Sequence, residues 1–314
     1  MNALGRAVRD YLRIRRSLGF KLVETGIALV DFASFLDRHG ASYITTELAL
    51  RWAVQPSRAA RAHWARRLSI VRLFAQFRSA SDPRTEIPPV GLLPGGYCRK
   101  PPYIYSDREI RALMKAARRL PSSLGLRPNA YATLLGLLTV TGMRLSEALA
   151  LDRDEVDLTE GVIRVRHAKY GKSRLLPVHR STSAALAEYV RRRDRLLRHL
   201  TTPAFFISDA GTRITQWAAR ETFVRLSREV GLRGPDGRFG HGPRLHDLRH
   251  RFAAATLLRW YRAGLDVERH MLRLTTYLGH THVTDTYWYI SAVPELMQLA
   301  AQRLEQPKEK ESSS

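Results

Sequence analysis

A run of prolines and glycines divides this sequence into two parts and constrains its fold more than any other feature. Six of the 15 prolines lie between residues 83 and 102, with three glycines among them. Proline lacks the backbone N–H that a helix interior or a central strand needs, so this stretch can form neither. A chain of 314 residues is also too long for one minimal module. We therefore expect two domains joined by a linker over residues 83–104.

The part before the linker has the pattern of a helical bundle, and no segment in it alternates as a strand does. Apolar residues recur at helical spacing in four segments: 4–18, 22–39, 45–55 and 57–79. In the second segment, Ile27, Val30 and Phe35 belong to a stripe that is expected to face the core. The fourth segment alternates arginines with Trp64 and Phe74, which fits a helix that packs on a core and also binds phosphates.

The part after the linker is predicted to be mainly helical with one β-hairpin. Ser106 is the expected N-cap of a first helix. The β-branched alternation over 162–166 is mirrored at 174–178 around Gly171, which predicts two antiparallel strands. The acidic residues of the segment 152–157 are expected to form a loop before this hairpin. Further helical patterns follow in four segments: 130–140, 181–200, 215–230 and 294–305.

The charge of the chain indicates a polyanion as its partner. It has 52 basic and 29 acidic residues, a net charge of +23. Residues 1–100 hold 17 basic and 7 acidic side chains and the rest hold 35 and 22, so the two parts carry +10 and +13. Nucleic acid and an anionic membrane surface are the candidates. The membrane is the weaker one, because the basic residues do not lie on one helix with a broad apolar face.

Localisation can be predicted from what the sequence lacks. No apolar run approaches the roughly 20 residues that a membrane span needs. The first residues, MNALGRAVRDYLRIRRS, have no apolar signal core followed by a cleavage site. We expect a cytoplasmic, nucleoid-associated protein without a membrane partner.

Basic residues gather at two helix positions after the linker. Arg144 lies in TGMRLSEAL, where Thr141 and Gly142 end one helix and the next one begins, beside backbone N–H groups that favour an oxyanion. In HDLRHRFA, a histidine, an arginine and a second histidine (246, 249 and 250) share one helical face. Such a cationic cluster is repulsive by itself, so it favours a bound anion.

The segment YLGHTHVTDTYWYIS adds a histidine and a tyrosine. His280 and Tyr289 are nine residues apart, which would place them on opposite faces of one continuous helix. Gly279 can end one helix, however, and Thr284 or its neighbour can cap another, so a break lets both side chains reach one site. Tyr287 and Tyr289 face roughly opposite ways on a helix, so only one of them can be the reactive group.

Together these residues resemble the tyrosine recombinase (phage integrase) family. The matching features over 105–292 are an arginine in T-G-x-R-x-S-E, a hairpin lysine, H-x-x-R-H, L-G-H and a tyrosine nine residues beyond that last histidine. The hairpin HAKYGKSRLLPVH is similar to the family's G-K-x-x-K-x-R-x-x-P with Ala168 in place of a glycine, which favours Lys169 over Lys172. The resemblance implies a catalytic set of Arg144, Lys169, His246, Arg249, His280 and the nucleophile Tyr289.

The resemblance also implies a reaction on DNA that uses no metal and no cofactor. Tyr289 would attack a phosphodiester to give a 3′-phosphotyrosyl intermediate and a free 5′-hydroxyl. Free tyrosine has a pKa of about 10, so only about one in a thousand is phenolate at pH 7 and cationic neighbours must assist it. We expect His246 to assist proton transfer, His280 to hydrogen-bond the phosphate and Lys169 to protonate the leaving group. The one cysteine, Cys98, excludes a four-thiolate zinc site.

The predicted protein is a mainly α two-domain DNA clamp with a small antiparallel sheet, which acts as a site-specific recombinase of a mobile element through a Holliday junction. Its partners are double-stranded DNA with specific sites and further copies of the chain, as a tetramer on DNA; other recombinases or accessory proteins remain open. The expected parts are a helical (SAM-like) core-binding domain at 1–82, the linker at 83–104, the catalytic domain at 105–292, a C-terminal helix at 293–305 that contacts a neighbouring protomer, and a disordered tail at 306–314.

Two alternatives use the same residues differently. A type IB topoisomerase has the same chemistry but relaxes supercoils, and it would act on any plasmid. A DNA-binding regulator with a decayed site would form no tyrosyl adduct, although the six intact residues argue against this.

Overall fold

The computed structural model describes residues 3–95, 101–166, 173–197, 202–234 and 242–305. The chain forms two compact units, Met1–Lys100 and Pro101–Ser314. The division between them lies inside the proline- and glycine-rich stretch. Within the described ranges, no helix is long and apolar enough to cross a membrane.

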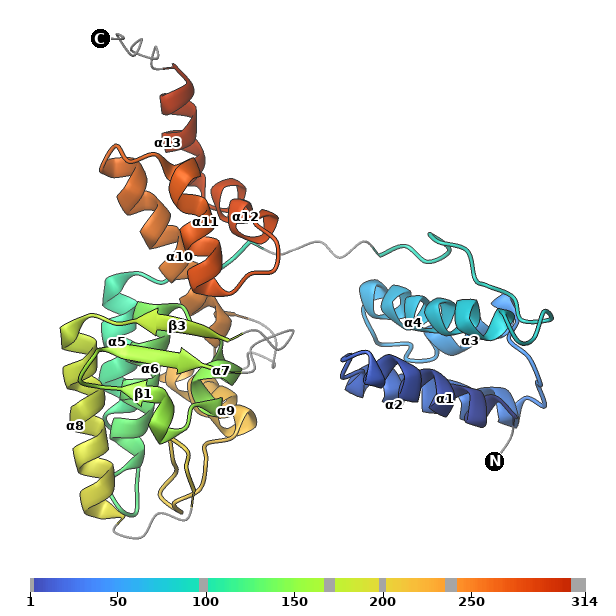
Figure 1. Ribbon diagram of the computed structural model, residues 1–314, viewed down its shortest axis with the longest axis horizontal. Coiled ribbons are helices and arrows are strands. Elements are labelled where there is room, and N and C mark those ends of the chain that lie inside the picture. The colour runs from blue at the N-terminus through green and yellow to red at the C-terminus, as the bar shows by residue number, and fades with distance from the viewer. Residues whose placement is uncertain (1–2, 96–100, 167–172, 198–201, 235–241, 306–314) are drawn as a thin grey trace. The chain divides into compact units, whose positions relative to one another are not determined.

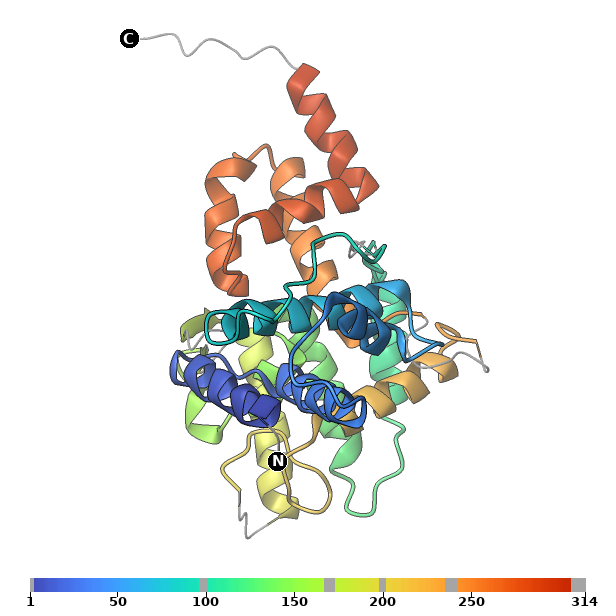
Figure 2. The same ribbon diagram turned by 90° about the vertical axis from the view of Figure 1, so that its right-hand side faces the viewer.

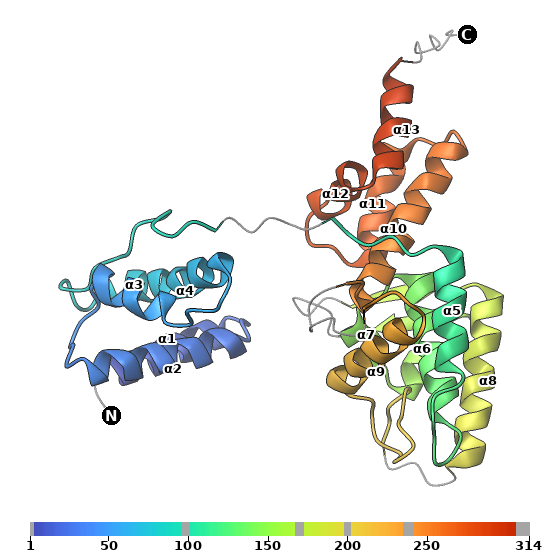
Figure 3. The ribbon, with the colours of Figure 1, turned by 180° about the vertical axis from the view of Figure 1, so that it is seen from behind.

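The first unit is a bundle of helices that pack as two pairs (Figures 1 and 3). Its helices are α1 (Ala3–Ser17), α2 (Val23–Arg38), α3 (Thr46–Val54) and α4 (Arg61–Ser79). The Thr45 side chain caps α3 by accepting a hydrogen bond from the Leu48 N–H at 3.2 Å. The four predicted helices are confirmed, although α4 begins at Arg61 rather than at residue 57.

The apolar stripe that α2 buries differs from the predicted one. Phe32, Phe35 and Leu36 are buried, but Ile27 and Val30 are 69% and 55% exposed. Apolar residues lie on more than one face of α2, and only one of those faces meets the other helices of the bundle. Periodicity alone therefore did not select the correct stripe.

The second unit contains a small antiparallel sheet beside its helices (Figure 1). The strands β1 (Val156–Asp157), β2 (Val162–Val165) and β3 (Arg174–Pro177) lie in the order β1-β2-β3. Strands β2 and β3 form the predicted hairpin, with Val162 opposite Pro177 and Val165 opposite Arg174. Arg174 is thus the first residue of β3. The turn residues 167–172, which include the predicted Gly171, lie outside the described part of the chain.

The prediction of a plain loop at 152–157 is wrong. Arg153–Glu155 form a short 3-10 helix, and Val156 pairs with Ile163 as the start of β1. The Glu155 side chain accepts the backbone N–H of Asp152 at 2.8 Å, which closes the turn of the 3-10 helix. Local hydrogen bonds of the acidic side chains thus order a segment whose composition alone resembles a loop.

Helices make up most of the second unit. They are α5 (Asp107–Ala117), α6 (Arg127–Thr141), α7 (Leu145–Ala150), α8 (Arg180–Leu196), α9 (Gln216–Glu229), α10 (Leu245–Arg262), α11 (Val267–Leu278), α12 (Thr284–Ala292) and α13 (Pro294–Glu305). Ser106 caps α5, as predicted, and the Glu109 side chain in turn accepts the backbone N–H of Ser106. Helix α6 is apolar on nearly all sides and is buried accordingly.

Two hydrophobic cores meet along α10, and this junction positions the candidate site. Leu245 and Leu248, in its first turns, belong to the core around α6 and the sheet. Ala253, Ala254 and Leu257 belong instead to a core shared with α11, α12 and α13. These four helices gather at one end of the unit (Figures 1 and 2). His246, Arg249 and His250 therefore lie where the two cores adjoin.

Candidate active site

Arg144 lies in the tight connection between α6 and α7. Gly142 ends α6 in the left-handed conformation at φ +61°, and a Cβ there would lie 2.6 Å from Cδ1 of Phe252. Arg144 is the N-cap of α7, and its backbone N–H donates to Oε2 of Glu147 at 3.0 Å. Its Nη1 also contacts Oε1 of Glu147 at 2.7 Å. The backbone turn and this carboxylate together fix the direction of the Arg144 guanidinium.

Glu147 is a buried carboxylate shared by two arginines. Besides Arg144, it accepts two hydrogen bonds from Arg174, at 2.8 Å from Nη2 and 3.2 Å from Nη1. Burial of the Glu147 carboxyl raises its pKa, but the hydrogen bonds and charge of Arg174, together with the hydrogen bonds from Arg144, outweigh this effect and lower the pKa to about 2. Glu147 is therefore ionised at neutral pH.

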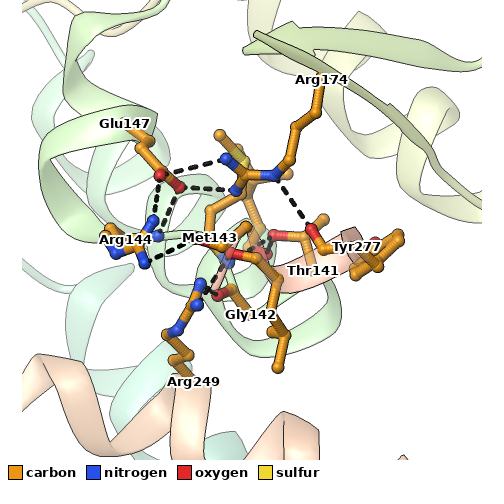
Figure 4. Close-up of polar contacts among 11 residues, drawn as sticks. Thr141, Gly142, Met143, Arg144, Glu147, Arg174, Arg249 and Tyr277 are labelled. Atoms are coloured by element: carbon orange, nitrogen blue, oxygen red, sulfur yellow. Dashed lines mark hydrogen bonds and ion pairs between the residues drawn. The ribbon is translucent and has the colours of Figure 1, made fainter. Parts of the chain in front are cut away.

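The C-terminal end of α11 holds three arginines on three successive carbonyls (Figure 4). The Tyr277 carbonyl accepts from Nε of Arg174 at 2.9 Å, the Leu278 carbonyl from Nη2 of Arg249 at 2.8 Å and the Gly279 carbonyl from Nη2 of Arg144 at 2.9 Å. The last carbonyls of a helix lack partners within the helix and carry partial negative charge. Guanidinium groups satisfy both requirements, so the end of α11 is a platform for three cations.

Arg249 is the most deeply buried of these arginines, with 2% of the residue exposed. Its Nη1 donates to the Gly142 carbonyl at 2.8 Å, so it joins the ends of α6 and α11. Burial and the nearby charge of Arg144 lower the pKa of Arg249 to about 10. The guanidinium therefore remains positively charged at neutral pH, in a place where it was predicted to bind an anion.

His246 is held in the neutral form. Burial, followed by the positive charge of Arg249, lowers the pKa of His246 to about 4. The His246 ring meets the ring of His250 edge to face, with centroids 4.7 Å apart. A neutral imidazole at pH 7 can accept a proton, whereas a protonated one cannot.

Tyr289 is fully buried, and its hydroxyl lies 3.0 Å from Nδ1 of His250. Its ring also stacks with that of His280, with centroids 6.3 Å apart. Tyr287, two residues earlier on α12, is 41% exposed instead. The two tyrosines therefore occupy different surroundings, as their spacing predicted, and Tyr289 is the one among the histidines.

The predicted break between His280 and Tyr289 is confirmed. Gly279 ends α11 in the left-handed conformation, and α12 begins at Thr284. The residue before it, Val283, is the N-cap and gives no side-chain cap, contrary to the expected capping by Thr284 or its neighbour. Buried Thr286 joins the two helices, because its hydroxyl contacts Thr275 Oγ1 at 2.9 Å and Nδ1 of His280 at 2.8 Å.

Lys169, the remaining predicted site residue, lies outside the described residues, as does Lys172, the other candidate for its role.

A cavity of about 420 Å³ lies at the site, and Arg144 and His246 are among the residues that line it. Three more arginines also line it: Arg220, Arg233 and Arg244. Of the residues that the structure describes, four arginines and no acidic residue thus line this cavity, which also contacts the candidate catalytic groups Arg144 and His246.

The sequence did not assign roles to three residues that the structure places in the site. Glu147 lies in the motif TGMRLSEAL, which assigns it no role, although its position three residues after Arg144 signals a carboxylate that can contact that arginine. Arg174 is the first residue of the expected second strand at 174–178, and the alternation of that strand indicates no partner for it. His250 was seen on the face of His246 but was not linked to Tyr289, which lies 39 residues further along the chain.

This mainly helical unit brings together two arginines, a cluster of histidines and a buried tyrosine, which are the residue types expected at the active site of a tyrosine recombinase. The model of the phage integrase family matches residues 104–295, and the chain belongs to that family, whose members cleave and rejoin DNA.

Similar proteins cover nearly the whole chain. The y4rB protein of Sinorhizobium fredii (strain NBRC 101917 / NGR234), provisionally named an integrase/recombinase, is 50% identical over 309 residues, which is 97% of this chain and 98% of that protein. The tyrosine recombinase XerC of Roseiflexus sp. (strain RS-1) is 30% identical over 228 residues, covering 72% of this chain and 66% of its own.

Solved structures share the fold at low sequence identity. The Tn1549 transposon integrase in complex with transposon right end DNA has a TM-score of 0.67 at 15% identity, over 98% of this chain and 100% of that one. The XerH recombinase bound to a palindromic difH substrate has a TM-score of 0.66 at 17% identity, over 90% and 79%. Both likenesses support the mainly helical fold with a small antiparallel sheet.

Proposed function

We propose that this tyrosine recombinase is a site-specific recombinase of a mobile element and that Tyr289 is its nucleophile. The observation that carries the proposal is the platform at the end of α11, where Arg144 and Arg249 are fixed on neighbouring carbonyls. Two rigidly held guanidinium groups beside a neutral histidine and a buried tyrosine fit the binding of one phosphodiester. Preorganised cations of this kind stabilise charge that develops in a transition state.

The scissile phosphate would lie against the guanidinium groups of Arg144 and Arg249. Each guanidinium has five N–H donors, and two of them bind protein oxygens in the hydrogen bonds described above. The remaining donors of each arginine can therefore serve the non-bridging oxygens. His280, which is anchored by Thr286, is proposed to hydrogen-bond the same phosphate.

Proton transfer from Tyr289 would use the histidine pair. The His250 ring contacts the Tyr289 hydroxyl, and the His246 ring lies beside it with a pKa of about 4. The neutral imidazole of His246 can take up the phenolic proton, by way of His250, as the oxygen attacks phosphorus. This arrangement supports the role predicted for His246 and adds His250 as the group that holds the hydroxyl.

The attack forms a bond between Tyr289 Oη and phosphorus and breaks the bond from phosphorus to the 5′ oxygen. Lys169 is proposed to give its proton to that oxygen, so that the products are a 3′-phosphotyrosyl ester and a free 5′-hydroxyl. A 5′-hydroxyl of a second DNA strand then attacks the ester and releases Tyr289, which exchanges the strands through a Holliday junction. Because the ester conserves the energy of the original bond, rejoining needs no other energy source.

DNA would be held by both units of the chain as a clamp, since the parts before and after the linker carry +10 and +13. We also propose that α13 contributes to a tetramer on DNA. Leu296 is buried within its own unit, and Arg303 donates to the Tyr261 carbonyl at 3.3 Å, whereas Met297 is 50% exposed. One face of α13 is thus packed in cis, and the face with Met297 is proposed to contact a neighbouring protomer.

The proposal is tested by covalent capture. The full-length protein is incubated with a pool of random nicked duplexes, denatured, and the DNA that stays attached is sequenced. We expect recovery of a defined site with wild type and with Tyr287→Phe, and none with Tyr289→Phe. Adducts with Tyr289→Phe that disappear with Tyr287→Phe would reassign the nucleophile. Relaxation of any plasmid without a preferred site would favour a type IB topoisomerase, and the absence of every adduct would favour a silent DNA-binding regulator.

A further inference from the structure

The Arg174 side chain joins three segments of the second unit that are distant in sequence. It projects from the first residue of β3, forms two hydrogen bonds with Glu147 of α7 and donates from Nε to the Tyr277 carbonyl of α11 (Figure 4). Only 11% of the side chain is exposed. One guanidinium therefore fixes the hairpin, the α7 carboxylate and the end of α11 relative to one another.

The packing around Arg174 is tight on the side of Gly279. A Cβ at Gly279 would lie 2.8 Å from Nη1 of Arg174, closer than side-chain contacts allow. Gly279 also has a φ of +69°, which favours glycine. Since the Gly279 carbonyl accepts the hydrogen bond from Arg144, displacement of Arg174 would also disturb the support of Arg144.

Arg174 also decides the charge of this cluster. Arg144, Arg174 and Arg249 are three cations and Glu147 is one anion, so the net charge is +2. Without Arg174, Glu147 would be neutralised by Arg144 alone and the net charge would fall to +1. The guanidinium of Arg144 would then be drawn to the carboxylate and would act less on a phosphate.

We propose that Arg174 is a positioning residue for DNA cleavage. It neutralises Glu147, so that the charge of Arg144 acts on the scissile phosphate, and it fixes the carbonyl platform that supports Arg144 and Arg249. Arg174 does not contact the phosphate itself. This inference rests on the proposed function, because it assigns Arg144 and Arg249 to the phosphate.

The test uses single-turnover formation of the covalent adduct on the duplex that wild type selects by capture. Adduct formation is followed over a range of DNA concentrations for Arg174→Gln, Arg174→Lys and the double variant Glu147→Gln/Arg174→Gln. Arg164→Gln is the matched control, because Arg164 is an exposed arginine of the neighbouring strand, opposite Leu175. The melting temperature of each variant is measured alongside.

We expect Arg174→Gln to slow the reaction at saturating DNA by between about tenfold and a hundredfold, since small misplacement of a reacting group has effects of this size. The DNA concentration at half-saturation should stay near that of wild type. Arg174→Lys should recover part of the rate by restoring the charge, and the double variant should recover part of it by removing the carboxylate that would otherwise draw on Arg144 alone. Arg164→Gln should leave the rate at saturation unchanged.

Three results would overturn the inference. The first is that Arg174→Gln reacts no more slowly than Arg164→Gln. The second is that Arg174→Gln binds DNA more weakly but keeps the wild-type rate at saturating DNA. The third is that the double variant reacts no faster than Arg174→Gln. If wild type forms no adduct with any DNA, the proposed function fails. The pairing of Arg174 with Glu147 is then tested separately, by measuring the pKa of Glu147 with carbon NMR. That pKa must rise in Arg174→Gln, and an unchanged value refutes the pairing.

Discussion

Replacement of Glu147 by glutamine should remove a large and pH-dependent part of the stability of the second unit. The pKa of Glu147 falls from 4.5 to about 2 on folding. At about 1.4 kcal/mol for each pH unit, this corresponds to about 3 kcal/mol of stability at neutral pH. Because the pKa is lower in the folded state, this stabilisation is fully present above pH 4.5 and is lost as the pH falls through about 2. Between pH 5 and pH 3, wild type should therefore lose about 2 kcal/mol more than Glu147→Gln.

Urea unfolding followed by circular dichroism at pH 7, 5 and 3 measures this difference. Glu155→Gln is the control, since Glu155 is equally buried at 7% exposed but contacts a guanidinium only at 3.3 Å, through Arg166. Glu147 contacts two guanidinium groups, at 2.7 and 2.8 Å. The reasoning is refuted if Glu147→Gln has the same dependence of stability on pH as wild type, or if the control loses as much stability at pH 7.

Three further predictions concern the backbone, the histidines and the C-terminal helix. Gly142→Ala should lower the free energy of unfolding in urea titrations by more than Gly211→Ala does. Both glycines have positive φ, which costs about 1–2 kcal/mol for alanine, but only at Gly142 would the added Cβ also clash, with Phe252 at 2.6 Å. Equal losses of stability in the two variants would contradict this packing. Nitrogen NMR should show His246 titrating near pH 4. Because its pKa is lower in the folded state, the stability that depends on its neutral form is fully present above pH 6.5 and is lost as the pH falls towards 4. A titration midpoint above pH 6.5 would contradict a buried neutral ring. Met297→Lys should impair pairing of two DNA sites in a gel assay more than binding to one, and equal impairment would contradict a role of α13 between protomers.

The sequence predicted those parts of the fold that depend on local chemistry. Pro-rich composition located the boundary near Lys100, and alternation located the hairpin that ends at Pro177. The stripe of α2 was misassigned, because Ile27 and Val30 are apolar yet exposed, and periodicity does not state which face meets a neighbour. The turn at Arg153–Glu155 was missed because its order comes from side-chain to backbone hydrogen bonds.

For the site, the sequence supplied the residue types but not their supports. Arg144 and Arg249 are predicted from their motifs. The carbonyls that hold them have no sequence signature, because every residue has a backbone carbonyl. The link from Glu147 to Arg174 spans 27 residues and depends on the register of the hairpin against α7. A buried carboxylate between cations is a tertiary feature, so the cluster of Glu147 and Arg174 can be recognised only in the fold.

The identity of the residue that becomes joined to DNA is the most direct test of the account. The adduct captured with wild type is digested with nuclease and trypsin, and the peptide 274–303, which lies between Arg273 and Arg303 and contains both candidate tyrosines, is fragmented in a mass spectrometer. The account predicts a nucleotide attached through its 3′-phosphate to Tyr289. A nucleotide on Tyr287, or an adduct that persists in Tyr289→Phe, would contradict it.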